Sequence, residues 1–346
     1  MATVDVTVRG AGAFGLSAAW ACCKAGAKVR VIDPFGVASG ASGGIVGALA
    51  PHVPENWNPK KAFQLESLLM ADHWWANVEA AGGVSSGYGR TGRLQPLADN
   101  AVELAQARAA GAAALWQGRA IWEVIPATGN GFEPPSPSGL LIHDTLSARL
   151  HPLQACTALA AALRASGVDI TEDGDTPDEG AVIWATGWRG LERLSAQHSR
   201  SMGAGVKGQA VLLAHDARHA PQLFVDGLHI IPHADGTTAI GSTTERDFEI
   251  PDTTDNQCDA LLAKARALVP ALANAPELRR WAGVRPRSRT RAPMLGAHPF
   301  RKGAYIANGG FKIGFGMAPL AAEKLAALVL HGQDTIPEDF RPDASL

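Results

Sequence analysis

The stretch VDVTVRGAGAFGLSAAWACCKAGAKVRVIDPFG, residues 4–36, decides the fold. Val4, Val6 and Val8 alternate with polar residues, which is the pattern of a half-buried strand. A glycine-rich turn follows, then an alanine-rich helical segment at residues 16–25 and a second apolar run at residues 29–32. The order strand, glycine turn, helix, strand predicts the beginning of a parallel sheet in an α/β fold.

The glycine turn has the spacing GxGxxG. Gly10 permits a tight turn, Gly12 lets a pyrophosphate approach the backbone, and Gly15 lets helix and strand pack closely. Asp33 follows the last glycine by 18 residues, where an acid accepts a ribose hydroxyl and disfavours a 2′-phosphate. This context favours a dinucleotide site over an incidental glycine turn. Arg9, which ends the first strand, is either a rim residue near the cofactor or a solvated arginine at the sheet edge.

The next segment, GVASGASGGIVGALAPH at residues 36–52, is a loop of small residues. A simple dehydrogenase would begin another helix–strand unit here. A loop of Ser, Gly and Ala can instead run beside a large flat cofactor, which favours FAD over NAD, with a flexible linker as the alternative.

Three later segments carry a resemblance to a known family: GAVIWATGWRG (180–190), WAGVRPRSRTRAPMLG (281–296) and AYIANGGFKIGFGMAPLAAEKLAALV (304–329). Their order resembles the D-amino-acid oxidase superfamily of FAD-dependent amine oxidoreductases, particularly its glycine oxidase and sarcosine oxidase branch. The chain also resembles the FAD domain of the bifunctional enzyme that matures 5-methylaminomethyl-2-thiouridine in tRNA. The shared features there are an ASG…GALxP loop and an R…R…PMxG segment.

The resemblance implies a Rossmann-like FAD-binding domain and a second substrate domain with a mixed or antiparallel sheet. It implies non-covalent FAD, since no cysteine lies in the segment around Arg285 or in the last loop. The expected cofactor-binding residues are Gly10, Ala11, Gly12, Ala13, Phe14, Gly15, Asp33, Pro34, Ser39, Ser42, Gly43, Gly44, Gly47, Ala48, Leu49, Ala185, Thr186, Gly187, Trp188, Gly310, Phe311, Lys312, Ile313 and Gly314.

The chain departs from the family between residues 168 and 180. Relatives have several strands before the A-T-G segment, whereas here only VDITEDGDTPDEG intervenes. We expect a shortened meander, and the contact it often makes near the adenine is left open.

We expect a discontinuous FAD-binding domain at residues 1–50, 140–205 and 283–340, with the substrate domain at 51–139 and 206–282. Strands are predicted within GRLQPLA, QAVLLAH, LHIIPHA and TTAIGSTT, and helices within residues 61–83 and 100–116. Most of the tryptophans are expected in the core, with Trp57 as the candidate for the substrate cavity.

Three residues are the candidates for catalysis. The resemblance assigns Arg285 to the substrate carboxylate, which a planar guanidinium binds with two hydrogen bonds, and a structural ion pair is the alternative. Lys312 lies before the last helix, where a cation would stabilise negative charge on reduced flavin, unless it is solvated or ion-paired. His52 ends the flavin loop and could meet substrate or ring, with a surface role equally open. His233 is a weaker candidate.

These features favour an oxidoreductase that breaks the C–N bond of an amino acid or N-substituted glycine. Hydride passes to flavin N5, and the resulting imine is hydrolysed. The alternative is a stand-alone flavoenzyme acting on carboxymethylaminomethyl-uridine in tRNA, for which Arg287, Arg289, Arg291, Arg301 and Lys302 would form a basic rim. A non-catalytic flavoprotein is a third reading. The electron acceptor, oxygen or another, and the oligomeric state are not visible in the sequence.

Bulk properties narrow the class. The chain has 346 residues, 46% of them hydrophobic, and a net charge of -2, so no global field recruits nucleic acid. It lacks an apolar run long enough to span a membrane and a signal-like N-terminus, and its four cysteines have no metal-ligand spacing. We expect a cytoplasmic protein with reduced thiols and no metal site.

Overall fold

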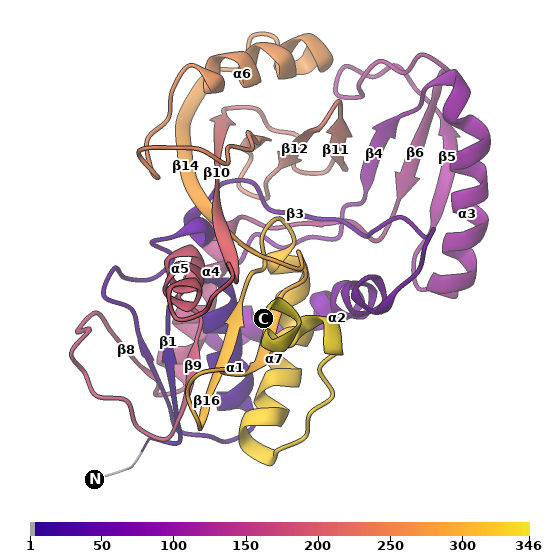
Figure 1. Cartoon of the computed structure of the whole chain (residues 1–346). Coiled ribbons are helices and arrows are strands. Elements are labelled where there is room, and N and C mark those ends of the chain that lie inside the picture. Colours follow the sequence, from indigo (N-terminus) through magenta and orange to yellow (C-terminus); the bar gives the residue numbers. More distant parts are fainter. Residues whose placement is uncertain (1–3) are drawn as a thin grey trace.

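The computed structural model describes residues 4–346, whose strands form two large sheets (Figure 1). The first has six strands in the order β15-β16-β9-β1-β2-β8, and every pairing except β15–β16 is parallel. These strands are β1 (Val6–Arg9), β2 (Val29–Ile32), β8 (Asp169–Thr171), β9 (Ala181–Trp184), β15 (Met294–Ala297) and β16 (Ala304–Asn308). This is the predicted Rossmann-like arrangement.

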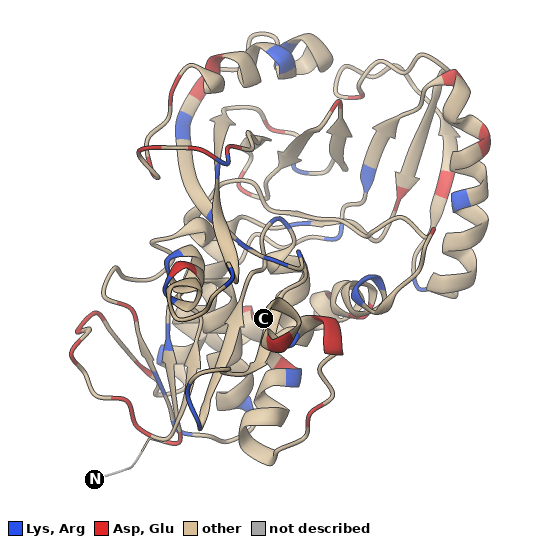
Figure 2. Ribbon diagram, in the orientation of Figure 1, with Lys and Arg blue, Asp and Glu red and all other residues tan. Residues whose placement is uncertain are grey.

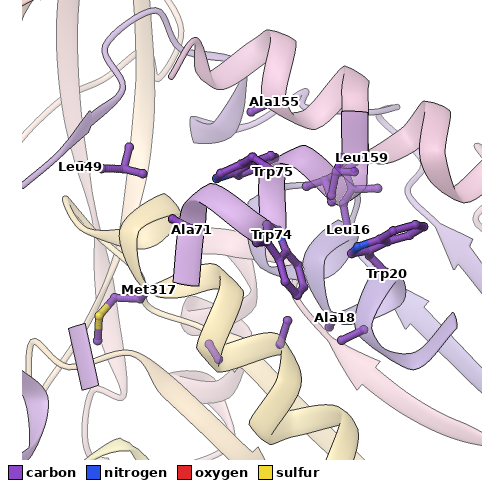
Figure 3. Packing of buried hydrophobic residues seen from close by; sticks show 14 of the residues in the cluster. Leu16, Ala18, Trp20, Leu49, Ala71, Trp74, Trp75, Ala155, Leu159 and Met317 are labelled. Atoms are coloured by element: carbon purple, nitrogen blue, oxygen red, sulfur yellow. The ribbon is translucent and has the colours of Figure 1, made fainter. Parts of the chain in front are cut away.

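Helices cover one face of this sheet. Helix α1 (Ala13–Lys24) packs against α4 (Pro152–Ala165) and α7 (Gly314–His331), and α2 (Pro59–Gly82) packs against both of these. Figure 3 shows the large side chains at this contact, where Leu16 and Trp20 of α1 lie near Trp74 of α2 and Leu159 of α4. Their burial places the main core between the helices and the sheet.

The predicted helix at residues 61–83 is α2, and its ends have clear local causes. Asn58 caps the first turn by accepting a hydrogen bond from the Lys61 N–H, and Pro59 occupies the first helical position. Gly83 ends the helix in the left-handed conformation, with a φ of 66°. The predicted helix at 100–116 is α3 (Val102–Trp116).

The second sheet has eight strands in the order β14-β10-β13-β12-β11-β4-β6-β5. It is mixed, as predicted, because β4 pairs parallel with β11 while the other pairings are antiparallel. Its strands are β4 (Arg93–Pro96), β5 (Trp122–Pro126), β6 (Leu140–Asp144), β10 (Gly203–Leu213), β11 (Gln222–Val225), β12 (Leu228–Pro232), β13 (Thr238–Gly241) and β14 (Glu277–Ser288).

Three further helices, a pair of two-residue strands and several 3₁₀ helices complete the fold of the described residues. Helix α3 packs on β5, and α6 (Gln257–Leu268) packs on β10. Helix α5 (Gly187–Ala196) follows β9, and β3 (Ala48–Leu49) pairs with β7 (Ala148–Arg149). Short 3₁₀ helices span Ala41–Gly43, Asp99–Ala101, Pro270–Leu272, Glu338–Phe340 and Pro342–Ser345.

The long strands β10 and β14 run from the eight-stranded sheet toward the six-stranded one (Figure 1). Strand β6 begins at Leu140, β10 spans residue 205 and β14 spans residue 283, so three of the expected domain boundaries fall on strands of the second sheet. The division into two domains stays a proposal.

Basic and acidic residues are interspersed along both halves of the chain (Figure 2), in keeping with the small net charge. All four cysteines are free thiols, as expected. Within residues 4–346, every helix falls short of the length and apolar character needed to cross a membrane.

Candidate active site

A cavity of about 1390 Å³ extends from the carboxyl end of the six-stranded sheet to one face of the eight-stranded sheet. It exceeds the roughly 300–1,000 Å³ of most small-molecule pockets. The three candidate catalytic residues, Arg285, Lys312 and His52, all line it. So do 21 of the 24 expected cofactor-binding residues, the exceptions being Ala11, Gly15 and Gly44.

Glycines at the start of α1 form one end of the cavity. Gly10 has a φ of +114°, and an added Cβ would lie 2.4 Å from the Ala185 carbonyl oxygen. A Cβ on Gly15 would lie 1.8 Å from the Gly10 carbonyl oxygen, so this glycine lets α1 approach β1. Gly12, the N-cap residue of α1, has no side chain to cap the helix, and Ser42 Oγ accepts from the Ala13 N–H at 3.0 Å, so Ser42 and the N-terminus of α1 face the cavity together.

Asp33 is held at the end of β2 by two backbone donors. Its carboxylate accepts from the Ala11 N–H at 2.8 Å and from the Phe35 N–H at 3.1 Å. Because both bonds fix the carboxylate at the rim of the cavity, it is placed to accept a ribose hydroxyl there.

Arg9 lies at the rim of the cavity and is not a solvated arginine at the sheet edge. Its guanidinium donates to the Asp178 carboxylate at 2.6 Å and to the carbonyl oxygens of Gly174 and Thr176. It also lies 5.8 Å from the Trp184 ring, and both side chains line the cavity. Arg9 therefore anchors the short loop that stands in place of the meander.

Arg285 lines the cavity and forms no salt bridge with any residue of the described part of the chain, 4–346. It donates to Ser242 Oγ at 2.6 Å and to the Thr243 carbonyl oxygen at 3.4 Å, both uncharged acceptors. Burial lowers the pKa of this guanidinium to about 10, an effect that Glu245 partly opposes, so it stays protonated at neutral pH. Gly208 makes room for it, since a Cβ there would lie 2.0 Å from Nη1.

The loop that carries Lys312 is tied to the strand that carries Arg285. The Phe311 N–H donates to the Pro286 carbonyl oxygen at 2.9 Å, and Gly310 forms a β-bridge with Arg287. Phe311 has a φ of 45°, an uncommon conformation for a residue with a side chain. Lys312 Nζ donates to Thr244 Oγ1 at 3.0 Å, and its pKa is lowered by burial and by Arg285.

His52 is oriented by Gln64. The Gln64 amide oxygen accepts from the His52 N–H at 2.9 Å and contacts ring atom Nδ1, while its Nε2 donates to the Ala50 carbonyl oxygen. Burial is the main cause that lowers the pKa of His52, with Lys60 and Lys61 adding to it. The imidazole is therefore neutral at physiological pH.

Two sequence-based expectations are corrected. Trp57 does not line the cavity and packs against the helical core, whereas Trp184, Trp188 and Trp281 do line it. His233 is a buried support, since its Nε2 contacts the Ile45 carbonyl oxygen at 2.8 Å.

Arg285, Arg287, Arg289 and Arg291 stand at every second position of the sequence, but they do not share one extended face. Strand β14 ends at Ser288, and Arg291 takes a left-handed turn with a φ of 62°. Arg289 donates to the carbonyl oxygens of Ser345 and Leu346. Of the row, Arg285 alone lines the cavity, and Arg301 stacks on Trp184 at 4.6 Å.

Sequence reasoning missed three cavity residues on the second sheet: Arg93 of β4, Phe224 of β11 and His229 of β12. One signal was present, because in LHIIP the apolar Leu228 and Ile230 flank His229 and so put it on the opposite face. The pairing that brings the three together is long-range and has no local signature.

The cavity fits FAD. It combines the N-terminus of α1 and close-packed glycines for the pyrophosphate with Asp33 for the ribose. The N-terminus of α7, without a side-chain cap, faces the other end, where Lys312 lies. The cavity thus offers binding groups for both ends of a dinucleotide as long as FAD.

Comparisons with known proteins agree with an FAD-binding fold. A model of the DAO family, described as FAD dependent oxidoreductase, matches residues 5–328. A glycine oxidase of Pseudomonas aeruginosa is 31% identical over 179 residues, which cover 51% of this chain and 49% of that protein. A bifunctional protein ThiO/ThiG of Nostoc sp. is 24% identical over 95% of this chain and 53% of its own. The chain thus matches about half the length of these curated relatives.

Solved structures show the same fold. Glycine oxidase from Geobacillus kaustophilus superposes with a TM-score of 0.80 at 21% identity, covering 98% of both chains. Iminodiacetate oxidase from Chelativorans sp. BNC1 gives a TM-score of 0.81 at 21% identity, covering 97% of this chain and 98% of that one.

Proposed function

The chain belongs to the DAO family of FAD-dependent oxidoreductases, and from that premise we propose that it oxidises the C–N bond of a small amino-acid-like substrate. Relatives named glycine oxidase and iminodiacetate oxidase support an amine carrying a carboxylate. The proposed role of Arg285 is to bind that carboxylate.

The observation that carries the proposal is the unpartnered charge of Arg285. Among the described residues, no carboxylate forms a salt bridge with it, although its guanidinium is largely shielded from solvent. A desolvated cation is costly unless an anion joins it. A substrate carboxylate supplies that anion, and Ser242 and Thr243 hold the guanidinium in place to receive it.

FAD, when bound, accepts a hydride from the carbon that bears the nitrogen. The protein must hold that carbon in position and favour the uncharged amine. Arg285 and Lys312 carry positive charge, and His52 and His229 have lowered pKa values that keep them neutral. This positive field opposes a substrate ammonium and so favours the free amine. The imine product is then hydrolysed by water.

Lys312 has a second proposed role. It lies beside the N-terminus of α7, where a cation and the helix dipole together stabilise an anion. Lys312 would there stabilise the negative charge of reduced FAD.

The test is anaerobic bleaching of the flavin absorbance by glycine, sarcosine, D-amino acids, proline and tRNA bearing carboxymethylaminomethyl-uridine. We expect bleaching by at least one small amino acid. Bleaching by none of them would overturn the proposal, and bleaching by the tRNA alone would establish the alternative substrate. Turnover with oxygen and with a dye then identifies the electron acceptor.

A further inference from the structure

A second group of side chains shares the cavity face with Arg285. Phe224 and His229 are cross-strand partners on β11 and β12, and Arg93 of β4 pairs with Gln222 of β11. Because side chains alternate along a strand, Arg93, Phe224 and His229 point to the same face of the sheet. All three line the cavity.

The Arg93 guanidinium is held in place by Asp144. Its Nε donates to the buried Asp144 carboxylate at 3.0 Å, and the two residues face each other across β4 and β6. No other side-chain hydrogen bond to a described residue occupies its remaining nitrogens. Asp144 thus offsets the charge and orients the guanidinium, and the Nη donors are left for a ligand.

His229 is held beside Arg93 with no polar partner. Its ring lies 4.7 Å from the Phe224 ring, and Nδ1 is buried without a hydrogen bond to a described residue. Nε2, by contrast, is not buried and has no hydrogen bond to a described residue, so it is the ring nitrogen that a ligand in the cavity can reach. Burial lowers the pKa of His229 to about 4, and the charges of Arg93, Lys312 and Arg285 add to that effect.

Asp144 shares this face through its pairing with Arg93, but it is buried and does not line the cavity. Asp33 and Asp252 are the only carboxylates among the described residues lining the cavity, and neither belongs to the eight-stranded sheet. A carboxylate on Arg285 balances one charge, while Lys312 keeps another and the Arg93 donors stay open. The surroundings of His229 therefore favour a second anion.

The spacing suits one small molecule. The Arg285 guanidinium lies over Gly208 of β10, and His229 lies on β12, with β13 between them. Two strand spacings are about 10 Å, and both side chains extend into the cavity. A substrate with two carboxylates a few bonds apart spans that gap.

We infer that Arg93 and His229 form a second anion-binding position, and that the preferred substrate is a dicarboxylic amine such as an acidic α-amino acid or an N-carboxymethyl amino acid. One carboxylate binds Arg285 and the other binds Arg93 and His229. This inference rests on the proposed function of the same cavity.

The test compares substrates that differ only in the second charge: aspartate with asparagine, in both configurations, and iminodiacetate with sarcosine. Anaerobic flavin reduction gives a dissociation constant for each. In the wild-type holoenzyme we expect the dicarboxylate to bind at least tenfold more tightly. His229→Phe, which keeps an aromatic ring beside Phe224, and Arg93→Lys, which keeps the pair with Asp144, should each reduce that ratio at least threefold.

The control is Lys264→Met, which removes a charge on α6 that does not line the cavity and should leave the ratio unchanged. The flavin spectrum and melting temperature verify that each variant is folded. Should one variant fail to fold, the wild-type ratio and the other variant still decide. Reduction by monocarboxylates with no preference for the second charge, or a preference that survives in the folded variants, would overturn this inference alone. Reduction by no substrate would overturn the proposed function as well.

Discussion

Gly208 offers a way to move Arg285 without replacing it. A Cβ at this position would lie 2.0 Å from Nη1, 2.2 Å from Nη2 and 2.3 Å from Cζ of Arg285. Ordinary contact needs about 3.5 Å, so Gly208→Ala should push the guanidinium away by roughly 1.5 Å. A displacement of about 1 Å can cost a hundredfold in rate. We expect kcat/KM for the best amino-acid substrate to fall about 10- to 100-fold, or about 1.4 to 2.7 kcal/mol.

The assay is steady-state turnover, with the flavin spectrum and thermal unfolding measured in parallel. Gly208 lies within β10 without the positive φ that would exclude alanine, so the backbone accepts the substitution and the main cost to stability is the displacement of the Arg285 guanidinium from Ser242. Gly131→Ala is the matched control, because its Cβ would meet only Ala271 at 3.9 Å and Gly131 does not line the cavity. A folded Gly208→Ala enzyme with unchanged kcat/KM would refute the placement of the substrate at Arg285.

Three further predictions concern residues around the cofactor and its loop. Lys312→Met should lower the midpoint potential of bound FAD by on the order of 30 mV, measured against a reference dye, and an unchanged potential would remove Lys312 from the flavin. Arg9→Leu removes the hydrogen bonds that hold the loop at residues 172–178. Because a charged hydrogen bond contributes about 1.4 kcal/mol, the FAD dissociation constant should rise about tenfold in a fluorescence titration. Equal affinity would show that the loop does not support the cofactor. Burial and His151 lower the pKa of His233 to about 4 in the folded protein. The unfolded chain therefore binds more protons than the folded one between about pH 4 and 6.5. The free energy of unfolding should fall as pH drops through that window, by up to about 1.4 kcal/mol per pH unit. Urea unfolding of His233→Gln should show a shallower pH dependence than wild type, and parallel curves would contradict this assignment.

Local patterns predicted much of the fold. The glycine spacing and the alternating valines foretold β1, α1 and β2, because each signal lies within a few residues of what it specifies. Strands β4, β12 and β13 also lie within the segments predicted for them. The spacing of Arg285, Arg287, Arg289 and Arg291 suggests an extended strand, but β14 ends at Ser288. The Arg291 N–H donates to the Ser288 carbonyl oxygen in a turn, and the alternating pattern gives no sign of that turn.

The residues that the second sheet contributes to the cavity were harder to predict from the sequence. Arg285 came from the family resemblance, and the structure adds that it has no ionic partner there. Arg93 and His229 lie 136 residues apart in sequence and meet only through the pairing of β4, β11 and β12. Arg9 depended on how the loop at 172–178 folds back, which is a tertiary contact.

Arg285 is proposed to bind a substrate carboxylate beside FAD. The most direct measurement is a titration of the holoenzyme with glycolate and with glycolamide, followed by the change in flavin absorbance, in wild type and in Arg285→Gln. We expect at least tenfold tighter binding of glycolate than of glycolamide by wild type, and loss of that preference in the variant. Equal affinity of wild type and a folded Arg285→Gln enzyme for glycolate would contradict it.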